Sequence, residues 1–349
     1  MEAQFEVIAD GEDITALLRD RLLGITVVDK PGIDSDELEI RLDDRDSRVQ
    51  FPPKGAVLRV SLGWSEKGLH DMGSYVVDEI EVSGPPDTIV LRGKPADMRQ
   101  DARSHRSISY ESTTLAKVVQ AVASRNGWEP VCTLETAIPR LDQVRESDVH
   151  FISRVARQYG ATATIKAGKL IVLARDAGQS ASGKKLPSIV LGKSDLETYS
   201  LTFPDRGSFG KVKARAHDTK TGKQVIIDLP NPEASSARTG GEYFDRHVYP
   251  NPDAARAAAA SRQQGLNRST ATGSLTTIGR ADISAESHII LQGFKADIDG
   301  QYLVDSTTQS YADKSWQTTI ALNAGNEGKA KAGRKKKTGP GQIINLPAL

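Results

Sequence analysis

The chain has 349 residues, of which 38% are hydrophobic and 26% charged, which is the composition of a globular protein with room for two or three domains. No apolar run approaches the roughly 20 residues that a membrane helix needs, and the first residues show no signal-peptide pattern, so we expect neither membrane insertion nor secretion. The single cysteine, Cys132, excludes an intrachain disulfide, argues against a cysteine metal cluster and favours a reducing compartment.

The near-neutral net charge of +1 hides an uneven distribution along the chain. Residues 326–349 carry six basic side chains and one acidic one, which leaves residues 1–325 with a net charge of −4. A slightly acidic body argues against specific nucleic-acid binding, and the basic segment is an appendage to that body.

The first part of the chain, residues 1–95, has the pattern of a β domain. Apolar and charged residues alternate over residues 38–42 and again over 58–62, which is typical of half-buried strands. Turn motifs at 52–55 and 84–87 separate these strands, so we expect an antiparallel sandwich or barrel.

Residues 96–187 contain apolar residues at the spacing of helices. Apolar residues over 115–122 lie on one helix face, with Ser112 or Thr113 as the expected N-cap, and a second helix is expected to start at Ser147. A hairpin follows over residues 161–173, so this region is predicted to be a small α+β domain.

Residues 188–325 return to the β pattern. In residues 211–216 small apolar side chains alternate with Lys211, Lys213 and Arg215, and residues 219–222 resemble a hairpin turn. Asn251 and Pro252 are the expected start of an alanine-rich helix, and strands are expected at about 288–292, 301–306 and 316–322.

We therefore predict a mainly β chain with an α+β insert. Two tube-like β-barrel domains, residues 1–95 and 188–325, are expected to flank the α+β domain of residues 96–187. Residues 326–349 are expected to form a flexible basic tail. The two β regions are not obvious sequence repeats and are interpreted as similar architectures from pattern alone.

Three segments resemble the late control protein D family of temperate contractile-tailed phages, which are baseplate hub proteins related to the N-terminal part of the VgrG spikes of type VI secretion. The segments are residues 11–15 with 36–44, residues 145–156 with Gly160 and its hairpin, and residues 268–275 through 300–304. The second segment departs from the family at Val149, where an aromatic residue is frequent.

The resemblance implies a structural hub in the tail baseplate. Members resemble trimers in which each chain supplies two tube-like barrels, so that a ring of six similar units joins a sixfold tail tube to a threefold spike. The implied partners are the chain itself, the tail tube protein, a separate central spike protein, other baseplate proteins and the tape-measure protein. Assembly in the bacterial host cytoplasm is expected, and the parent particle is either an infectious phage or a DNA-free tail-like bacteriocin.

The sequence contains no established catalytic, metal-binding or cofactor-binding motif. None of the six histidines forms a metal-binding pair, and His150 is interpreted as a helix-surface residue. The charged cluster at residues 43–48 lacks the spacing of a calcium loop, and Cys132 lacks a nearby base.

Two other functions were weighed against the structural one. A tail-tip peptidoglycan hydrolase would need a carboxylate pair, for which Glu135, Glu146 and Asp148 are the candidates, although helix capping explains the last two better. Gene regulation is disfavoured by the acidic body and the absence of a recognition-helix pattern.

The candidate partner contacts lie on the basic strand and in the tail. The strand face is interpreted first as solvated and second as a contact with an acidic partner or the tail lumen. The tail is expected to become ordered only on assembly, against the spike or a neighbouring subunit. The residues are Lys211, Lys213, Arg215, Arg334, Lys335, Lys336, Lys337, Ile343, Ile344 and Leu346.

Overall fold

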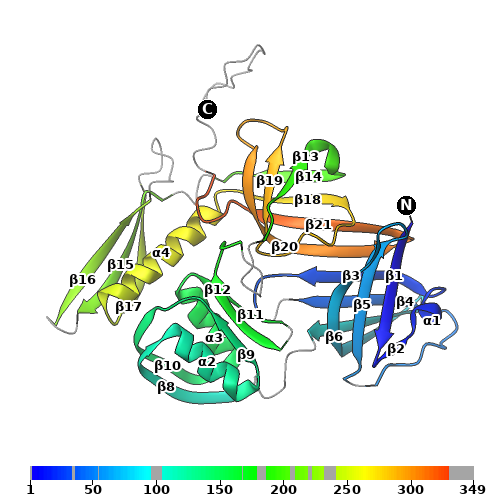
Figure 1. Cartoon of the computed structure of the whole chain (residues 1–349), viewed down its shortest axis with the longest axis horizontal. Coiled ribbons are helices and arrows are strands. Elements are labelled where there is room, and N and C mark those ends of the chain that lie inside the picture. Colours follow the sequence, from blue (N-terminus) through cyan, green and yellow to red (C-terminus); the bar gives the residue numbers. More distant parts are fainter. Residues whose placement is uncertain are drawn as a thin grey trace, which may run out of the picture.

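The computed structural model describes residues 2–33, 36–53, 55–95, 104–166, 168–178, 186–204, 209–218, 222–231 and 241–329. Strands predominate, and the prediction of a mainly β chain with an α+β insert is confirmed. Four parts are distinguished in Figure 1: an N-terminal β unit, the insert, a C-terminal β unit and a side module. Residues 330–349, which hold the predicted tail contacts, lie outside the described residues.

The N-terminal β unit contains the alternating strands that the sequence predicts. Leu38, Ile40 and Leu42 point into its core, and they are at most 2% exposed. Its elements are β1 (Ala3–Ala9), β2 (Glu12–Asp13), α1 (Thr15–Leu18), β3 (Leu22–Asp29), β4 (Glu37–Asp43), β5 (Val57–Trp64), β6 (Gly68–Ser83) and β7 (Thr88–Pro95).

The insert packs two helices against a two-stranded sheet of β8 and β10 and a three-stranded sheet of β11, β12 and β9. Ser147 caps α3 as predicted, but α2 is capped by Thr114 and not by Ser112 or Thr113, because β8 continues to Thr114. The elements are β8 (His105–Thr114), α2 (Leu115–Asn126), β9 (Glu129–Cys132), β10 (Ala137–Ser147), α3 (Asp148–Gln158), β11 (Ala161–Lys166) and β12 (Lys169–Ala174).

The C-terminal β unit is interrupted after its second strand by the side module. The β unit contains β13 (Ile189–Gly192), the 3-10 helix η2 (Lys193–Asp195), β14 (Thr198–Thr202), β18 (Thr272–Ile278), β19 (His288–Gln292), β20 (Gly300–Ala312) and β21 (Ser315–Asn323). The side module contains β15 (Lys211–Asp218), β16 (Lys223–Pro230), β17 (Glu242–Tyr249) and α4 (Pro252–Arg268).

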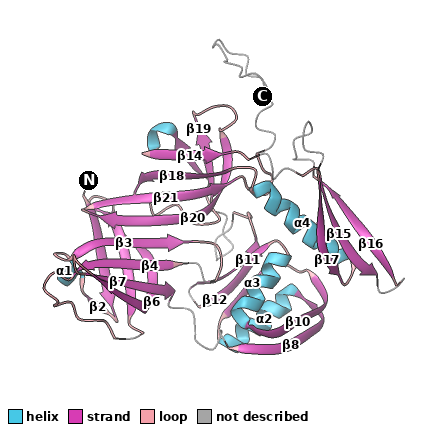
Figure 2. Cartoon of the chain, turned by 180° about the vertical axis from the view of Figure 1, so that it is seen from behind, coloured by secondary structure: helices cyan, strands magenta, loops and turns pink. Residues whose placement is uncertain are grey.

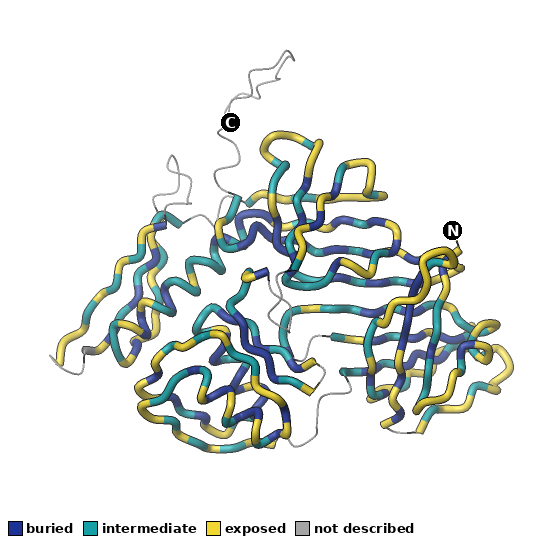
Figure 3. The backbone as a smooth tube through the Cα atoms, in the orientation of Figure 1, coloured by how far each residue is buried: buried dark blue, intermediate teal, exposed yellow. Residues whose placement is uncertain are grey.

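The side module has a hydrophobic core of its own, which the alanine-rich helix α4 forms with β15. Its small side chains, among them Ala255 and Ala259, bury the equally small Val212, Ala214 and Ala216 of β15. Close packing of small residues gives this module its own core, as the buried residues in Figure 3 illustrate. Asn251 caps α4 as predicted, and the hairpin turn predicted at 219–222 lies largely outside the described residues.

The two β units are joined in one 13-stranded sheet. Strand β20 pairs antiparallel with β3, from Thr307 opposite Asp29 to Tyr311 opposite Ile25. Figure 2 shows the succession β14, β18, β21, β20, β3 and β4 across this junction. The predicted barrels are therefore neighbours with a shared hydrogen-bonded seam as well as separate cores.

The two β units also repeat one topology. In spatial order the N-terminal unit runs β1-β5-β6-β7-β4-β3 and the C-terminal unit runs β13-β19-β20-β21-β18-β14. Apart from the two-residue β2, each strand therefore has a counterpart at the same position in the chain order. One direction differs, because β1 is antiparallel to β5 whereas β13 is parallel to β19.

The repeat extends to individual residues of β6 and β20. A bulge interrupts β6 against β7 between Val77 and Glu79, and another interrupts β20 against β21 between Val304 and Ser306. Tyr75 and Tyr302 stand at equivalent places, and each hydroxyl donates to a backbone carbonyl three or four residues earlier.

A short sequence match accompanies this geometry. Gly73 and Gly300 both have positive φ, 116° and 127°, which favours glycine two residues before each tyrosine. The segments 73–78 and 300–305 read Gly-Ser-Tyr-Val-Val-Asp and Gly-Gln-Tyr-Leu-Val-Asp. A match of only six residues is too short to reveal the repeat from the sequence alone.

Candidate assembly surfaces

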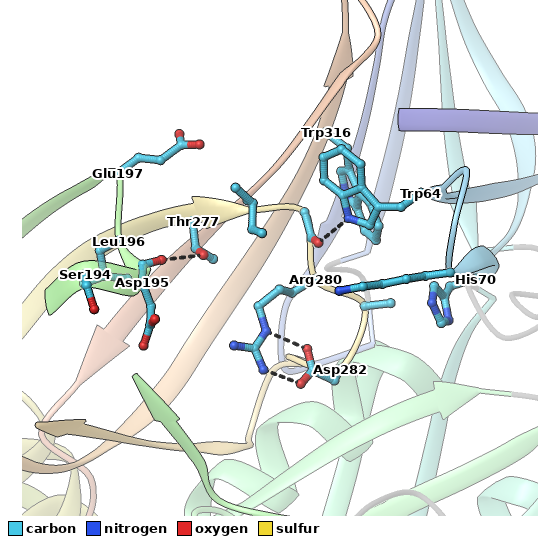
Figure 4. A pocket seen from close by; sticks show the side chains of 14 residues that line it. Trp64, His70, Ser194, Asp195, Leu196, Glu197, Thr277, Arg280, Asp282 and Trp316 are labelled. Carbon is cyan, nitrogen blue, oxygen red and sulfur yellow. Dashed lines mark hydrogen bonds and ion pairs between the residues drawn. The ribbon is translucent and has the colours of Figure 1, made fainter. Parts of the chain in front are cut away.

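A cleft of about 660 Å3 lies between the two β units (Figure 4). Trp64 from the end of β5 and Trp316 from β21 approach with ring centroids 5.7 Å apart, and the Trp64 Nε1 donates to the Gly279 carbonyl at 2.9 Å. A Cβ on Gly279 would lie 2.0 Å from the Trp316 ring, so only glycine fits beneath that indole. This wall of the cleft is a packing seam between the units.

Two of the charged side chains that line the cleft neutralise each other. Arg280 and Asp282 form an ion pair at 2.6 Å, and the hydrogen bonds from Arg280 hold the pKa of the Asp282 carboxyl below its usual value. Such a carboxylate stays ionised near neutral pH and is a poor general acid. The cleft therefore has the chemistry of a structural junction.

Two of the three candidate carboxylates of a hydrolase, Asp148 and Glu146, are bound by basic or amide side chains. Asp148 is fully buried and accepts hydrogen bonds from Arg125 at 2.8 Å and from Asn126 and Gln143 at 2.9 Å. Burial opposes its ionisation, but these hydrogen bonds and the Arg125 charge leave the pKa of Asp148 lowered.

Glu146 has a similar environment at the start of α3. Burial is outweighed by hydrogen bonds from Arg154 and His150, so the pKa of Glu146 is also lowered. Glycoside hydrolysis requires one carboxylic acid whose pKa is raised, and neither of these residues supplies it. The third candidate, Glu135, is exposed in the loop after β9.

Other sequence candidates occupy surface or structural positions. His150 is exposed on α3, as interpreted, and burial raises the pKa of the Cys132 thiol, which disfavours a reactive thiolate. Asp46 forms an ion pair with Arg21 at 2.7 Å in the charged cluster at 43–48. Among the described residues no group of three or more histidine, cysteine or acidic side chains is arranged to hold a metal ion.

Asp29 connects three parts of the chain. One carboxylate oxygen of this β3 residue accepts from Lys166 Nζ of the insert at 2.9 Å, and the other accepts from the Ala285 backbone of the C-terminal unit at 2.8 Å. Lys166 also contacts Asp36 at 3.3 Å. Burial raises the pKa of Asp36, whereas Lys166 outweighs burial at Asp29 and lowers the pKa of that carboxyl.

A second charged cluster fixes the insert to the C-terminal unit. His288 Nε2 lies 2.5 Å from Asp176, and Arg175 contacts Glu286 at 3.4 Å and Asp305 at 3.0 Å. Burial raises the pKa of Glu286. No local sequence pattern indicates these clusters, because the partners that they join are 110 or more residues apart.

The first residues of the predicted tail are attached to these clusters. Asn326 donates from its backbone to Asp176 at 2.6 Å and from its amide to the Arg175 carbonyl at 3.0 Å. Lys329 donates from its backbone to Thr270 at 2.8 Å, and its ammonium lies 4.2 Å from the Tyr302 ring centroid. Asn326 and Lys329 thus contact the folded body, and the predicted extent of the flexible tail, residues 326–349, stays a prediction.

The basic strand face is found on β15, on the side away from α4. Lys213 pairs with Glu242 at 2.5 Å, and the Arg215 guanidinium lies 5.1 Å from the Phe244 ring centroid. Lys211 reaches the same Glu242 at 3.8 Å, so one carboxylate partly neutralises this face. The role of these three residues in partner contact stays a prediction.

Comparison with known proteins places this geometry among phage tail proteins. Residues 54–315 match the family described as Phage tail baseplate hub (GPD). A protein of Escherichia phage 186, described as a probable baseplate hub protein, is 32% identical over 357 aligned residues, which cover 91% of this chain and 92% of the phage protein.

Two solved structures show the same fold at low sequence identity. The 43 kDa tail protein of prophage MuSo2 from Shewanella oneidensis has a TM-score of 0.69 and 16% identity over 93% of this chain and 99% of its own. An Escherichia coli component of the type VI secretion system, described as similar to T4 tail proteins, has a TM-score of 0.52 and 13% identity over 86% of this chain and 73% of its own.

The helices of the described residues are all too short or too polar to span a membrane.

Proposed function

Because the chain belongs to the phage tail baseplate hub (GPD) family, we propose that it acts as a trimeric adaptor which joins the sixfold tail tube to the threefold central spike. Members of this family are structural hub proteins and not enzymes, and this chain is a baseplate hub protein of a phage-type tail. The hydrolase alternative is set aside on this ground.

The observation that carries the trimer proposal is the repeated β unit. Each chain has two units of the same strand order, so three chains supply six similar units. A closed threefold assembly then presents six near-equivalent positions to the tube and three equivalent positions to the spike. The unit boundaries 1–95, 96–187 and 188–325 are part of this proposal.

The surfaces around this ring define the other proposed partners. The tube and spike would occupy opposite faces, the tape-measure protein would contact the lumen, and other baseplate proteins would bind outside. Stable contacts of this kind bury more than about 1,000 Å2 each. Assembly would take place in the bacterial host cytoplasm, for an infectious phage or a tail-like bacteriocin alike.

Mass measurement in solution tests the stoichiometry directly. The purified chain, alone and mixed with the spike protein of the same particle, is expected to give three copies of the hub per complex. A spike-bound complex with one, two or six hub copies would overturn the proposal.

Residues 330–349 are proposed to contribute to spike attachment. A chain ending at Lys329 keeps the contacts of Asn326 and Lys329 and should fold normally. We expect it to trimerise but to bind the spike more weakly than the full chain in a co-purification assay. Equal recovery of the spike with both chains would exclude this role.

A further inference from the structure

Building on the trimer proposed above, we propose that neighbouring copies join by pairing β14 of one copy with the free edge of β6 in the next. This contact would repeat between copies the β20–β3 junction that joins the two units within each copy. The occupant of each edge is therefore a second copy of this chain.

Strand β20 pairs with other strands of the same chain along both of its edges. Strand β19 pairs with residues 300–303 and β3 pairs with residues 307–311, while β21 occupies the opposite edge. Its counterpart β6 pairs with β5 through residues 68–76 and with β7 through residues 75–83. No described strand continues after β5 along that edge, so residues 78–83 have a strand partner on one side only.

Strand β14 also has one edge that pairs with no described strand. Its counterpart β3 lies between β4 and β20, whereas β14 pairs with β18 alone among the described strands. Four of its five residues are exposed, among them Tyr199 at 42%, and Phe203, which directly follows the strand, is 44% exposed. Exposed sheet edges of this kind are covered in folded proteins by charge, by irregularity or by a partner strand.

The repeat fixes the register of the proposed pairing. When the β6 and β20 bulges are superimposed, Glu79 aligns with Ser306, and Val82 therefore corresponds to Gln309. Counting across the β4–β7 and β18–β21 pairs, Leu201 of β14 corresponds to Val27 of β3. Since Gln309 lies opposite Val27 within the chain, Val82 is expected opposite Leu201 of the next copy.

The side chains at this register are chemically complementary. The same alignment sets Ile80 opposite Phe203, which directly follows β14, so two apolar pairs fall on one face of the junction. Val82 is 58% exposed in the single chain, whereas Gln309 and Val27 at the corresponding places are 5% and 3% exposed. Cross-strand apolar pairs stabilise a sheet, and this pairing would bury side chains that are otherwise in water.

The pairing is also consistent with a closed ring. Two different edges of the chain meet, so the interface is heterologous, and it forms a ring when the rotation between successive copies closes. Around such a ring the N-terminal and C-terminal β units alternate, joined in turn by β20–β3 within a copy and by β6–β14 between copies. Three copies complete six units.

Single-cysteine variants test the register. In a Cys132→Ser background, Val82→Cys and Leu201→Cys are made separately, mixed under assembly conditions and treated with a short thiol cross-linker. Opposite residues have Cβ atoms about 5 Å apart, within reach of such a reagent. We expect covalent dimers in the mixture and none from either variant alone, and a chain with both substitutions should link three copies.

A register control accompanies this experiment. Thr202 neighbours Leu201 but points to the other face of β14, so Val82→Cys mixed with Thr202→Cys should link poorly. The strand pairing would be wrong if mass measurement shows trimers but Val82→Cys and Leu201→Cys do not cross-link. It would also be wrong if either variant alone gives cross-linked dimers. In both cases the proposal of a trimeric hub would still stand. Failure to trimerise even with the spike present would overturn both proposals.

Discussion

At the level of single residues, the structure depends on ionised groups that join distant segments. The sequence correctly indicated local features, such as the Ser147 cap and the surface position of His150. It did not indicate the bond between Asp29 and Lys166, which are 137 residues apart. Such pairs follow from the tertiary arrangement, and no periodicity or spacing encodes them.

The Asp29–Lys166 pair predicts a pH dependence of stability. The folded-state pKa of Asp29 is lowered, so its ionised form stabilises the fold above its ordinary pKa of about 4, and this contribution is lost as pH falls through the lowered value. Removing the Lys166 charge in Lys166→Met leaves burial to raise the Asp29 pKa. Acid unfolding, followed by circular dichroism, should therefore begin at a higher pH in the variant.

Lys169→Met provides the matched control for this prediction. Lys169 pairs with Glu129 on the surface, where both side chains are partly exposed, so its removal should have little effect on the acid transition. Identical acid transitions in Lys166→Met and the unsubstituted chain would contradict the assigned role of the pair.

At the level of elements, the predictable features are those set by nearby residues. The hairpin of β11 and β12 and the start of α4 follow from local patterns and were predicted. The β20–β3 pairing and the interruption of the second unit by the side module were not, since they join strands that are far apart in the chain. The only sequence sign of the repeat was the six-residue match at 73–78 and 300–305.

Two glycines are expected to respond oppositely to alanine. Gly279→Ala forces a methyl group into the Trp316 indole and should destabilise the chain by about 1–3 kcal/mol. Gly265 lies within α4, where an added Cβ would lie 3.6 Å from the Arg268 guanidinium, so Gly265→Ala should stabilise the chain by about 0.5–1 kcal/mol. Urea denaturation of both variants checks this, and equal effects would contradict the packing at the seam.

The free edge of β6 predicts a selective assembly defect. Val82→Lys leaves the monomer intact because Val82 is exposed there, but it would bury an unpaired charge between copies. A cost of about 3 kcal/mol corresponds to a roughly 100-fold weaker association in sedimentation experiments.

Val144→Lys is the control for this assembly prediction. Val144 is also an exposed valine, 68% accessible, but it lies on β10 of the insert, away from the proposed strand pairing. Association should be unchanged in this variant. A similar loss in both variants would mean that the effect is not specific to the β6 edge.

At the level of the whole molecule, the chain is built as two copies of one β unit with additions. The insert lies between the units in sequence, and the side module interrupts the second unit, yet the shared strand order is retained. In the proposed threefold assembly this arrangement would offer six similar surfaces, as the proposed role between a sixfold tube and a threefold spike requires.

Electron microscopy of the purified hub assembly, viewed along its axis, tests this account most directly. We predict a ring of six similar β densities around a channel, with strict threefold symmetry and approximate sixfold symmetry. A ring in which only three β densities surround the channel, or an assembly without threefold symmetry, would contradict it.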